Sequence, residues 1–218
     1  MIWKFITFLV RKLEPEVAHQ ISLIALKLGF HPRLKRIEIP VKINNLHFTN
    51  FLGVAAGFDK NAQIIERIHY LNFGLTEVGT ITPLPQYGNP KPRVFRLEKD
   101  KAIINRNGFN NLGMAQAIKK LKNYRKKFPV GSDFILGVNI GPNKDSNDRF
   151  NDYEILSKNL SEFADYLTIN ISSPNTPNLR DFHQTNNLKK VLISVKNGIA
   201  KSKSLDLQLP IFLKIAPD

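Results

Sequence analysis

The chain has 218 residues, of which 42% are hydrophobic, and it contains no cysteine. This length and composition exclude a globally disordered protein, and the absence of thiols excludes disulfides, thiolate metal sites and a cysteine nucleophile. The formal net charge is +14, which indicates either an anionic partner (nucleic acid, a lipid surface, phosphorylated ligands) or a lysine-rich solvated surface.

Two short apolar helices are predicted near the N-terminus. Apolar residues between Trp3 and Leu13, interrupted by basic residues, suit one helix; Pro15, flanked by two glutamates, favours the start of a second helix that Gly29 ends. No apolar run reaches the roughly 18 residues of a membrane span, and no signal-peptide core or cleavage site is present. Residues 1–39 are therefore predicted to form either an anchor lying in a membrane surface or a helical hairpin packed on the main domain.

Beyond Pro40 the sequence alternates between short apolar runs and helical segments. The candidate strands are residues 52–58, 75–81, 134–140, 166–171 and 211–215, and the helices between them are residues 62–71, 112–127, 152–163 and 188–200. This alternation predicts a parallel sheet with crossover helices. A hairpin over residues 93–105 interrupts the second strand-to-helix connection.

Polar residues collect where the predicted strands end, namely at Asp59, Lys60, Asn61, Thr80, Asn139, the stretch 170–180 and Lys214. Both a (β/α)₈ barrel and a doubly wound sheet bind ligands at this edge. The glycine fingerprint of a dinucleotide-binding fold does not follow the first strand, which favours the barrel. The predicted fold class is α/β, of the TIM-barrel type, with about five β/α units present.

These strand-end residues suit one kind of ligand. Small residues around Ala56 and Gly57 would let a flat molecule approach the backbone, and a lysine inside an apolar strand must be paired or serve a ligand. Asparagines match heterocycles with alternating C=O and N–H groups, and lysines match anions. Taken singly, each motif also suits a turn, tight packing or a surface lysine. The five histidines lack metal-ligand spacing, and serine-hydrolase and P-loop motifs are absent.

Six motifs give the chain a specific resemblance. They occur in the order AAGFDKN, EVGTITPLPQYGNPKPRVFRL, INRNGFNN, GVNIGPNKD, INISSPNTPNLR and LKIAPD. With them the chain closely resembles the quinone-dependent (class 2) dihydroorotate dehydrogenases over essentially its whole length. The resemblance implies an FMN-containing barrel that oxidises dihydroorotate to orotate in pyrimidine synthesis and passes electrons to ubiquinone or menaquinone.

The resemblance also implies roles for individual residues. The positions that match FMN contacts are Ala56, Gly57, Lys60, Thr80, Asn139, Asn170 and Lys214. Those that match the orotate cage are Lys60, Asn105, Arg106, Asn107, Gly108, Phe109, Asn170 and Asn175. Ser173 matches the catalytic base, which would need a relay through water or a threonine such as Thr176. His19 and Arg96 match positions at the inner end of a quinone tunnel.

Serine at position 173 separates this sequence from cysteine-using barrels of similar pattern, the class 1 enzymes and the tRNA-dihydrouridine synthases. Two residues depart from the family pattern. Asn107 stands where an apolar residue is more usual, and Asn178 stands where glycine is common, at a position that asparagine tolerates in the left-handed conformation.

The chain ends directly after its fifth predicted strand, whereas a whole barrel needs about 250 residues. We expect a fragment, a truncated gene product or half of a split protein, with residues 40–218 forming an incomplete FMN-binding barrel. By itself it would bind FMN weakly or not at all and turn over no dihydroorotate. The alternatives are a non-catalytic remnant and a basic nucleic-acid-binding module. No nucleic acid is expected, because aromatic residues are not interleaved with the lysines. The predicted location is peripheral, on the cytoplasmic side of the cell membrane.

Overall fold

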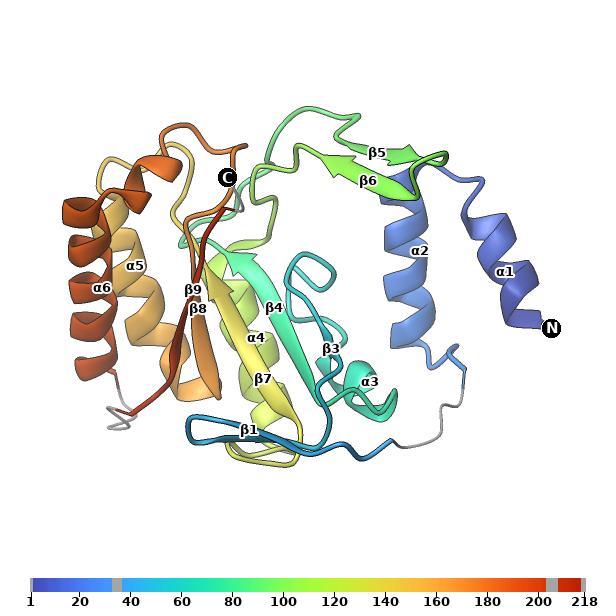
Figure 1. The fold of residues 1–218 in the computed structure, drawn as a ribbon, viewed down its shortest axis with the longest axis horizontal. Coiled ribbons are helices and arrows are strands. Elements are labelled where there is room, and N and C mark those ends of the chain that lie inside the picture. The colour runs from blue at the N-terminus through green and yellow to red at the C-terminus, as the bar shows by residue number, and fades with distance from the viewer. Residues whose placement is uncertain (1, 33–36, 203–207, 217–218) are drawn as a thin grey trace.

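The structure, a computed structural model, describes residues 2–32, 37–202 and 208–216. Within these residues one parallel sheet has the strand order β3-β4-β7-β8-β9 (Figure 1). Its strands are Gly53–Val54, Leu75–Ile81, Ile135–Ile140, Tyr166–Asn170 and Ile211–Lys214. Spatial order follows chain order, whereas a doubly wound sheet reverses its order midway. The sheet is therefore the wall of a β/α barrel, and the doubly wound alternative is ruled out.

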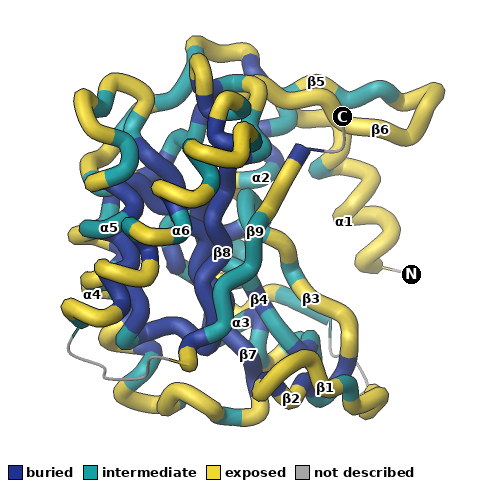
Figure 2. Tube along the Cα trace, turned by 60° about the vertical axis from the view of Figure 1, so that its left-hand side comes forward, coloured by how far each residue is buried: buried dark blue, intermediate teal, exposed yellow. Residues whose placement is uncertain are grey.

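The crossover helices cover the outer face of this sheet. Leu136 and Leu167 on the strands are fully buried against them, in the main hydrophobic core. Figure 2 shows the middle strands as the most buried part of the molecule. The helices are α3 (Ile65–Tyr70), α4 (Gly113–Arg125), α5 (Arg149–Leu160) and α6 (Thr185–Ala200), with short 3₁₀ turns at Ser161–Phe163 and Arg180–His183.

Alternate residues of the strands point to the inner face, because side chains along a strand alternate between the two faces of a sheet. Ile135 and Tyr166 belong to a second, smaller apolar cluster there, together with Leu46 and Phe48. The last two come from an antiparallel pair, β1 (Val41–Ile43) and β2 (Leu46–Phe48), that closes this end of the barrel wall. This pair was not predicted, because strands of three residues carry too little periodicity to recognise.

Several predicted boundaries were wrong by three residues or more, among them the starts of α3 (65 rather than 62) and α6 (185 rather than 188). The first strand was expected over residues 52–58, but only Gly53–Val54 pairs with β4. The chain leaves the sheet there because Gly57 takes a positive φ of 100° and its N–H donates to the Gly79 carbonyl. The third crossover helix begins at Arg149 rather than 152, because Asp148 caps it by accepting from two backbone N–H groups.

The predicted N-terminal helices and the inserted hairpin are present. They are α1 (Ile2–Val10), α2 (Pro15–Lys27), β5 (Val94–Leu97) and β6 (Ala102–Asn105). α2 is tied to the hairpin by Arg93, whose Nε and Nη2 lie 3.0 and 2.9 Å from Oε1 of Glu16, both residues being buried. α1 has no buried residue. No helix in the described ranges is both long and apolar enough to cross a membrane. Met1, residues 33–36 and the end of the LKIAPD motif, 217–218, lie outside the described residues.

Candidate active site

Three predicted site residues meet at the carboxyl ends of neighbouring strands. The Thr80 hydroxyl donates to Oδ1 of Asn139 at 2.6 Å, and Nδ2 of Asn170 donates to Thr80 Oγ1 at 2.9 Å and to Asn139 Oδ1 at 3.3 Å. All three are buried. Residues 80, 139 and 170 are far apart in the sequence, and only the parallel arrangement of β4, β7 and β8 brings them together.

A fourth member of this network, Glu77 on β4, was not predicted. Its Oε1 accepts from Nδ2 of Asn139 at 2.7 Å, and its Oε2 accepts from the Thr168 and Tyr166 hydroxyls at 2.8 and 3.1 Å. The sequence held a usable signal, since a carboxylate inside the apolar strand 75–81 needs partners as much as Lys214 does. Burial and the nearby carboxylate raise the pKa of Tyr166, which keeps it a donor.

The loop after β8 continues the network. Oδ1 of Asn170 accepts from the backbone N–H of Ser172 at 3.1 Å and from its hydroxyl at 2.9 Å. Nζ of Lys214 donates to Ser172 Oγ at 3.2 Å. Lys214 was expected inside a buried strand; it is in fact exposed, because β9 has one neighbour among the described strands.

Ser173, the predicted base, is half-buried in this loop, where its Oγ accepts from the backbone N–H of Asn175 at 3.2 Å. Nδ2 of Asn175 donates to the carbonyl of Asn105 at 3.3 Å, which links the loop to the predicted substrate cage. Thr176 is buried, and its hydroxyl has no hydrogen-bond partner among the described residues. Asn178 has a φ of 59°, the left-handed conformation expected of it.

Lys60 lies in the loop between β3 and α3 and is half-buried. No described residue hydrogen-bonds or ion-pairs with its amine, and burial lowers its pKa, a shift that the Arg93 guanidinium adds to and Glu16 opposes. The preceding Asp59 fixes this loop by accepting from the backbone N–H groups of Gln63 and Ile64 at 2.8 and 2.9 Å. A partly desolvated cation without an anion is a binding group for an anionic ligand.

Ala56 and Gly57 leave the backbone accessible beside Lys60. A Cβ built on Gly57 would meet no atom within 4 Å, so the space above it is open. A cavity of about 470 Å³ runs along the inner face of the sheet from Ala55 and Ala56 to Lys214. The small residues, the cation and the amides suit a planar, acceptor-rich group such as a flavin ring.

The predicted substrate cage is assembled only in part. Gly108 has a positive φ of 70°, and the Phe109 ring lies beside Gly141. Nδ2 of Asn107 donates to Oδ1 of Asn105 at 3.1 Å. Arg106 does not join them: its guanidinium donates to the Pro92 carbonyl at 2.9 Å and stacks over the Phe95 ring.

Of the two predicted quinone-site residues, His19 lies on α2 and Arg96 lies on β5. Nε2 of His19 donates to the Phe58 carbonyl at 2.7 Å, and burial lowers the pKa of its imidazole, with Lys60 adding to the shift and Asp59 opposing it. Nη1 of Arg96 donates to the carbonyls of Arg11 and Leu13 at 3.0 and 2.6 Å, which fixes the link between α1 and α2.

A singly wound parallel sheet with amides, lysines and a serine at its strand ends defines an α/β-barrel protein with a ligand site at that face. The sequence model described as Dihydroorotate dehydrogenase matches residues 38–218. The chain belongs to the dihydroorotate dehydrogenase family.

Individual relatives agree with this assignment. Proteins named dihydroorotate dehydrogenase (quinone) from Mesorhizobium japonicum and Bartonella tribocorum are 50% identical over 208 residues and 47% identical over 209 residues. Each alignment covers 94% of this chain and 56% of the relative. The crystal structure of the Eimeria tenella enzyme with ferulenol superposes with a TM-score of 0.85 at 38% identity, covering 96% of this chain and 63% of that one. The chain thus spans little more than half the length of its curated relatives.

Proposed function

We propose that this chain carries the FMN and substrate site of a quinone-dependent dihydroorotate dehydrogenase, which oxidises dihydroorotate to orotate in pyrimidine biosynthesis. The observation that carries the proposal is Lys60, a half-buried cation without a partner among the described residues, next to the open backbone at Gly57. A carboxylate on a planar ring would satisfy both features at once.

The residues present fit FMN. Ala56 and Gly57 would lie against the ring, and Lys214 would place a cation at its edge. When bound, FMN would supply the hydride acceptor of the reaction and return its electrons to a quinone. The cation of Lys214 would stabilise negative charge that develops on that edge.

Ser173 would take the proton from C5 of dihydroorotate. A serine hydroxyl is a weak base, so it needs a group to receive its own proton. Thr176 lies three residues further on, buried and without a partner in the described part of the chain, and would pass that proton on directly or through water. Lys60 would hold the substrate carboxylate, and Asn105 and Asn175 the pyrimidine amides; the direction of Arg106 supports no contact of its own.

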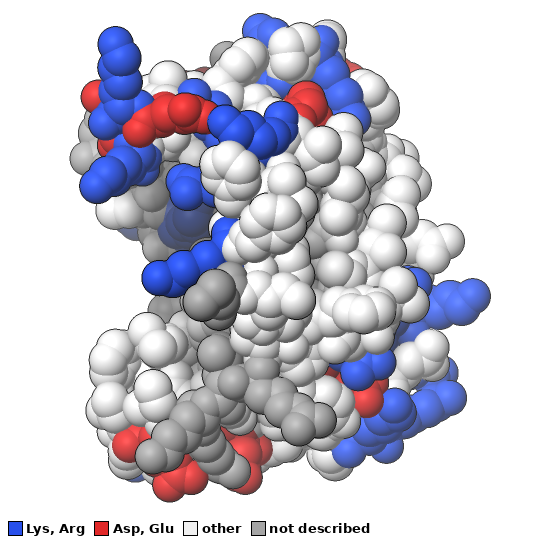
Figure 3. All heavy atoms as spheres, turned by 90° about the vertical axis from the view of Figure 1, so that its right-hand side faces the viewer, with Lys and Arg blue, Asp and Glu red and all other residues white. Residues whose placement is uncertain are grey.

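The N-terminal hairpin would place the site at the cytoplasmic side of the cell membrane, as a peripheral protein with access to ubiquinone or menaquinone. Large apolar side chains such as Phe5, Phe8 and Leu28 are exposed on α1 and at the end of α2. Figure 3 views this side: uncharged residues form a broad zone, and Lys and Arg, with some Asp and Glu beside them, lie at its upper and lower ends. An apolar surface bordered by cations suits an anionic bilayer.

In this proposal residues 1–39 form the helical hairpin, and residues 40–218 form the incomplete FMN-binding barrel. Strands β3 and β9 each have one neighbour among the described strands, and the inner face between them is open. This supports the expectation that the 218-residue chain binds FMN weakly by itself. A chimera that joins residues 1–218 to the remaining part of the Mesorhizobium japonicum relative should bind FMN more tightly than the 218-residue chain does.

The proposal is tested by flavin reduction in that chimera. With dihydroorotate the bound FMN should bleach, and Ser173→Ala should slow bleaching by orders of magnitude while orotate still binds. Asn178→Gly is a control for the loop, since Asn178 is exposed, glycine accepts its left-handed backbone conformation, and it is assigned no contact with flavin, substrate or the transferred proton. Flavin binding without reduction in the unsubstituted chimera would contradict the assigned reaction, and near-normal reduction in Ser173→Ala would remove the serine from its role.

A further inference from the structure

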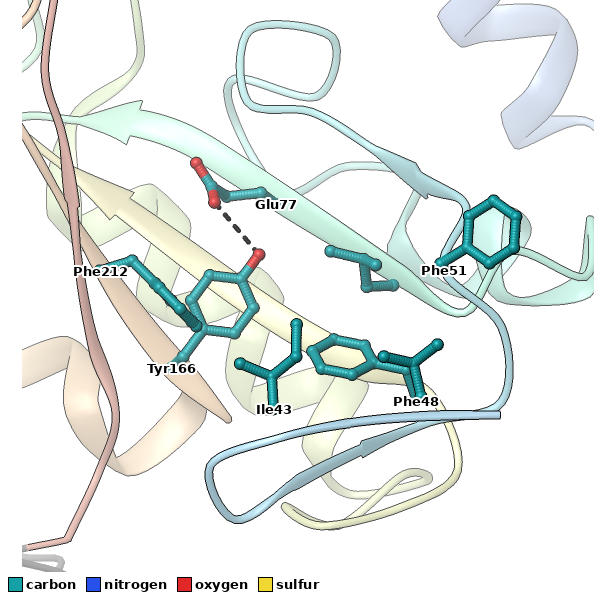
Figure 4. A pocket seen from close by; sticks show the side chains of 8 residues that line it. Ile43, Phe48, Phe51, Glu77, Tyr166 and Phe212 are labelled. Carbon is teal, nitrogen blue, oxygen red and sulfur yellow. Dashed lines mark hydrogen bonds between the residues drawn. The ribbon is translucent and has the colours of Figure 1, made fainter. Parts of the chain in front are cut away.

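A single chain of hydrogen bonds connects Glu77 on the inner face of the sheet to Lys214 at the strand ends. From Lys214 it passes through Ser172, Asn170, Thr80 and Asn139, with donor–acceptor distances of 3.2, 2.9, 2.9, 2.6 and 2.7 Å. Figure 4 shows the Glu77 end, where the carboxylate meets the Tyr166 hydroxyl above the pocket that β1 and β2 close.

The two ends of this chain decide the direction of every bond between them. An ionised carboxylate can only accept, and an ammonium can only donate. Because Glu77 accepts from Nδ2 of Asn139, the Asn139 oxygen must face Thr80, and the Thr80 hydroxyl must donate to it. The Asn170 amide then donates to Thr80, which leaves its oxygen to accept from Ser172. A neutral apolar residue at position 77 would remove the acceptor that orients the Asn139 amide, and only the end at Ser172 and Lys214 would then hold the direction.

We propose that Glu77 is a positioning residue that orients the Asn139 amide and so fixes, together with the Ser172 end, the hydrogen-bonding direction of the strand-end cluster. The amide oxygens of Asn139 and Asn170 each accept two hydrogen bonds within the cluster. What the cluster offers a ligand is therefore donors, namely the remaining N–H groups of the exposed Lys214. It is built for an acceptor edge with C=O or unprotonated ring nitrogen atoms.

The ligand part of this inference rests on the proposed function, since a flavin edge is such an acceptor edge. The direction of the bonds does not, because it follows from side chains of this chain alone. Two separate measurements can therefore distinguish a failure of the inference from a failure of the proposed function.

The direction is tested by a double-substitution cycle on thermal unfolding of the 218-residue chain. Asn139→Asp turns acceptors toward Glu77 and should lower the melting temperature. Adding Glu77→Gln should raise it again, because the glutamine amide can donate to the new carboxylate. In the unsubstituted background, Glu77→Gln should be neutral or destabilising. The expected result is that the effect of Glu77→Gln on the melting temperature changes sign between the two backgrounds. An equal lowering of the melting temperature in both backgrounds would overturn the proposal.

The matched control is Tyr166→Phe, which removes another donor to the same carboxylate but keeps the ring. It should not recover stability in the Asn139→Asp background. If Asn139→Asp does not fold, side-chain amide NMR signals of Asn139 decide: Glu77→Leu should move them toward those of a free amide, and Tyr166→Phe should not. Unchanged signals in Glu77→Leu would also overturn the proposal.

The ligand part is measured as FMN affinity in the chimera described above. Glu77→Leu should weaken FMN binding roughly tenfold, equivalent to about 1.4 kcal/mol, and Glu77→Gln should weaken it less. Equal FMN affinity in Glu77→Leu and the unsubstituted chimera would refute the donor-edge assignment. No FMN binding in the unsubstituted chimera would count against the proposed function. The thermal-unfolding cycle of Asn139→Asp and Glu77→Gln would still decide the role of Glu77.

Discussion

The ion pair between Glu16 and Arg93 should provide most of the free energy that attaches α2 to the hairpin. Both Arg93 nitrogen contacts go to one oxygen, Oε1, and the other oxygen, Oε2, has no hydrogen-bond partner among the described residues, with Lys91 at 3.8 Å. Glu16→Ala would leave a buried guanidinium with its bonds to the Tyr87 and Asn89 carbonyls and without an anion. Removing one partner of a buried pair costs roughly 3–5 kcal/mol.

Glu16→Gln should cost much less, because the glutamine oxygen can take the place of Oε1 and keep both bonds from Arg93. It loses the charge of the acceptor, which corresponds to about 1 kcal/mol, the difference between a charged and a neutral hydrogen bond. Glu14→Ala is the control on the same helix: Glu14 is exposed and caps α2 through the Val17 N–H at 3.0 Å, and losing a cap costs about 1 kcal/mol.

Urea denaturation and hydrogen exchange of α2 measure these costs together. In Glu16→Ala, α2 should detach from the hairpin, because detachment lets the unpaired Arg93 guanidinium reach water. The amide protons of the detached helix should then lose their protection from exchange. If α2 detaches in this way, the loss of unfolding free energy in Glu16→Ala cannot exceed the free energy that attaches α2 to the rest of the chain. The reasoning is refuted if Glu16→Ala costs no more than Glu14→Ala and α2 stays protected.

Three further predictions follow from the site. Lys60→Met should weaken orotate binding in the chimera roughly 10- to 100-fold, the worth of a hydrogen bond to a charged group, whereas Lys42→Met, an exposed change, should not; equal affinities would contradict the assignment. The lowered pKa of buried His19 means that the unfolded chain binds protons more readily, so stability should fall as the pH falls from about 6.5 through the lower folded-state pKa; a flat urea midpoint over this range would contradict it. Gly137→Ala would overlap the Tyr166 ring and should cost about 1–3 kcal/mol of unfolding free energy, whereas unchanged stability would show that the ring can move freely.

Local patterns predicted much of the fold. The five main strands and four crossover helices, the two N-terminal helices and the inserted hairpin were all anticipated, since periodicity and helix-end residues are local signals. The positive φ at Asn178 was anticipated for the same reason, because the backbone conformation of a turn depends on the residue that occupies it. The strand-end motifs also indicated the family that the comparisons show.

The sequence by itself therefore determined the succession of elements and the polar residues at the strand ends. The tertiary structure settled the choice, already favoured by the sequence, of a barrel wall over a doubly wound sheet, because strand order depends on contacts between distant segments. It also showed that Arg106 turns toward Pro92 and that Glu77 directs the strand-end amides. The direction of a hydrogen bond depends on both partners, and these partners are brought together only when the parallel strands align.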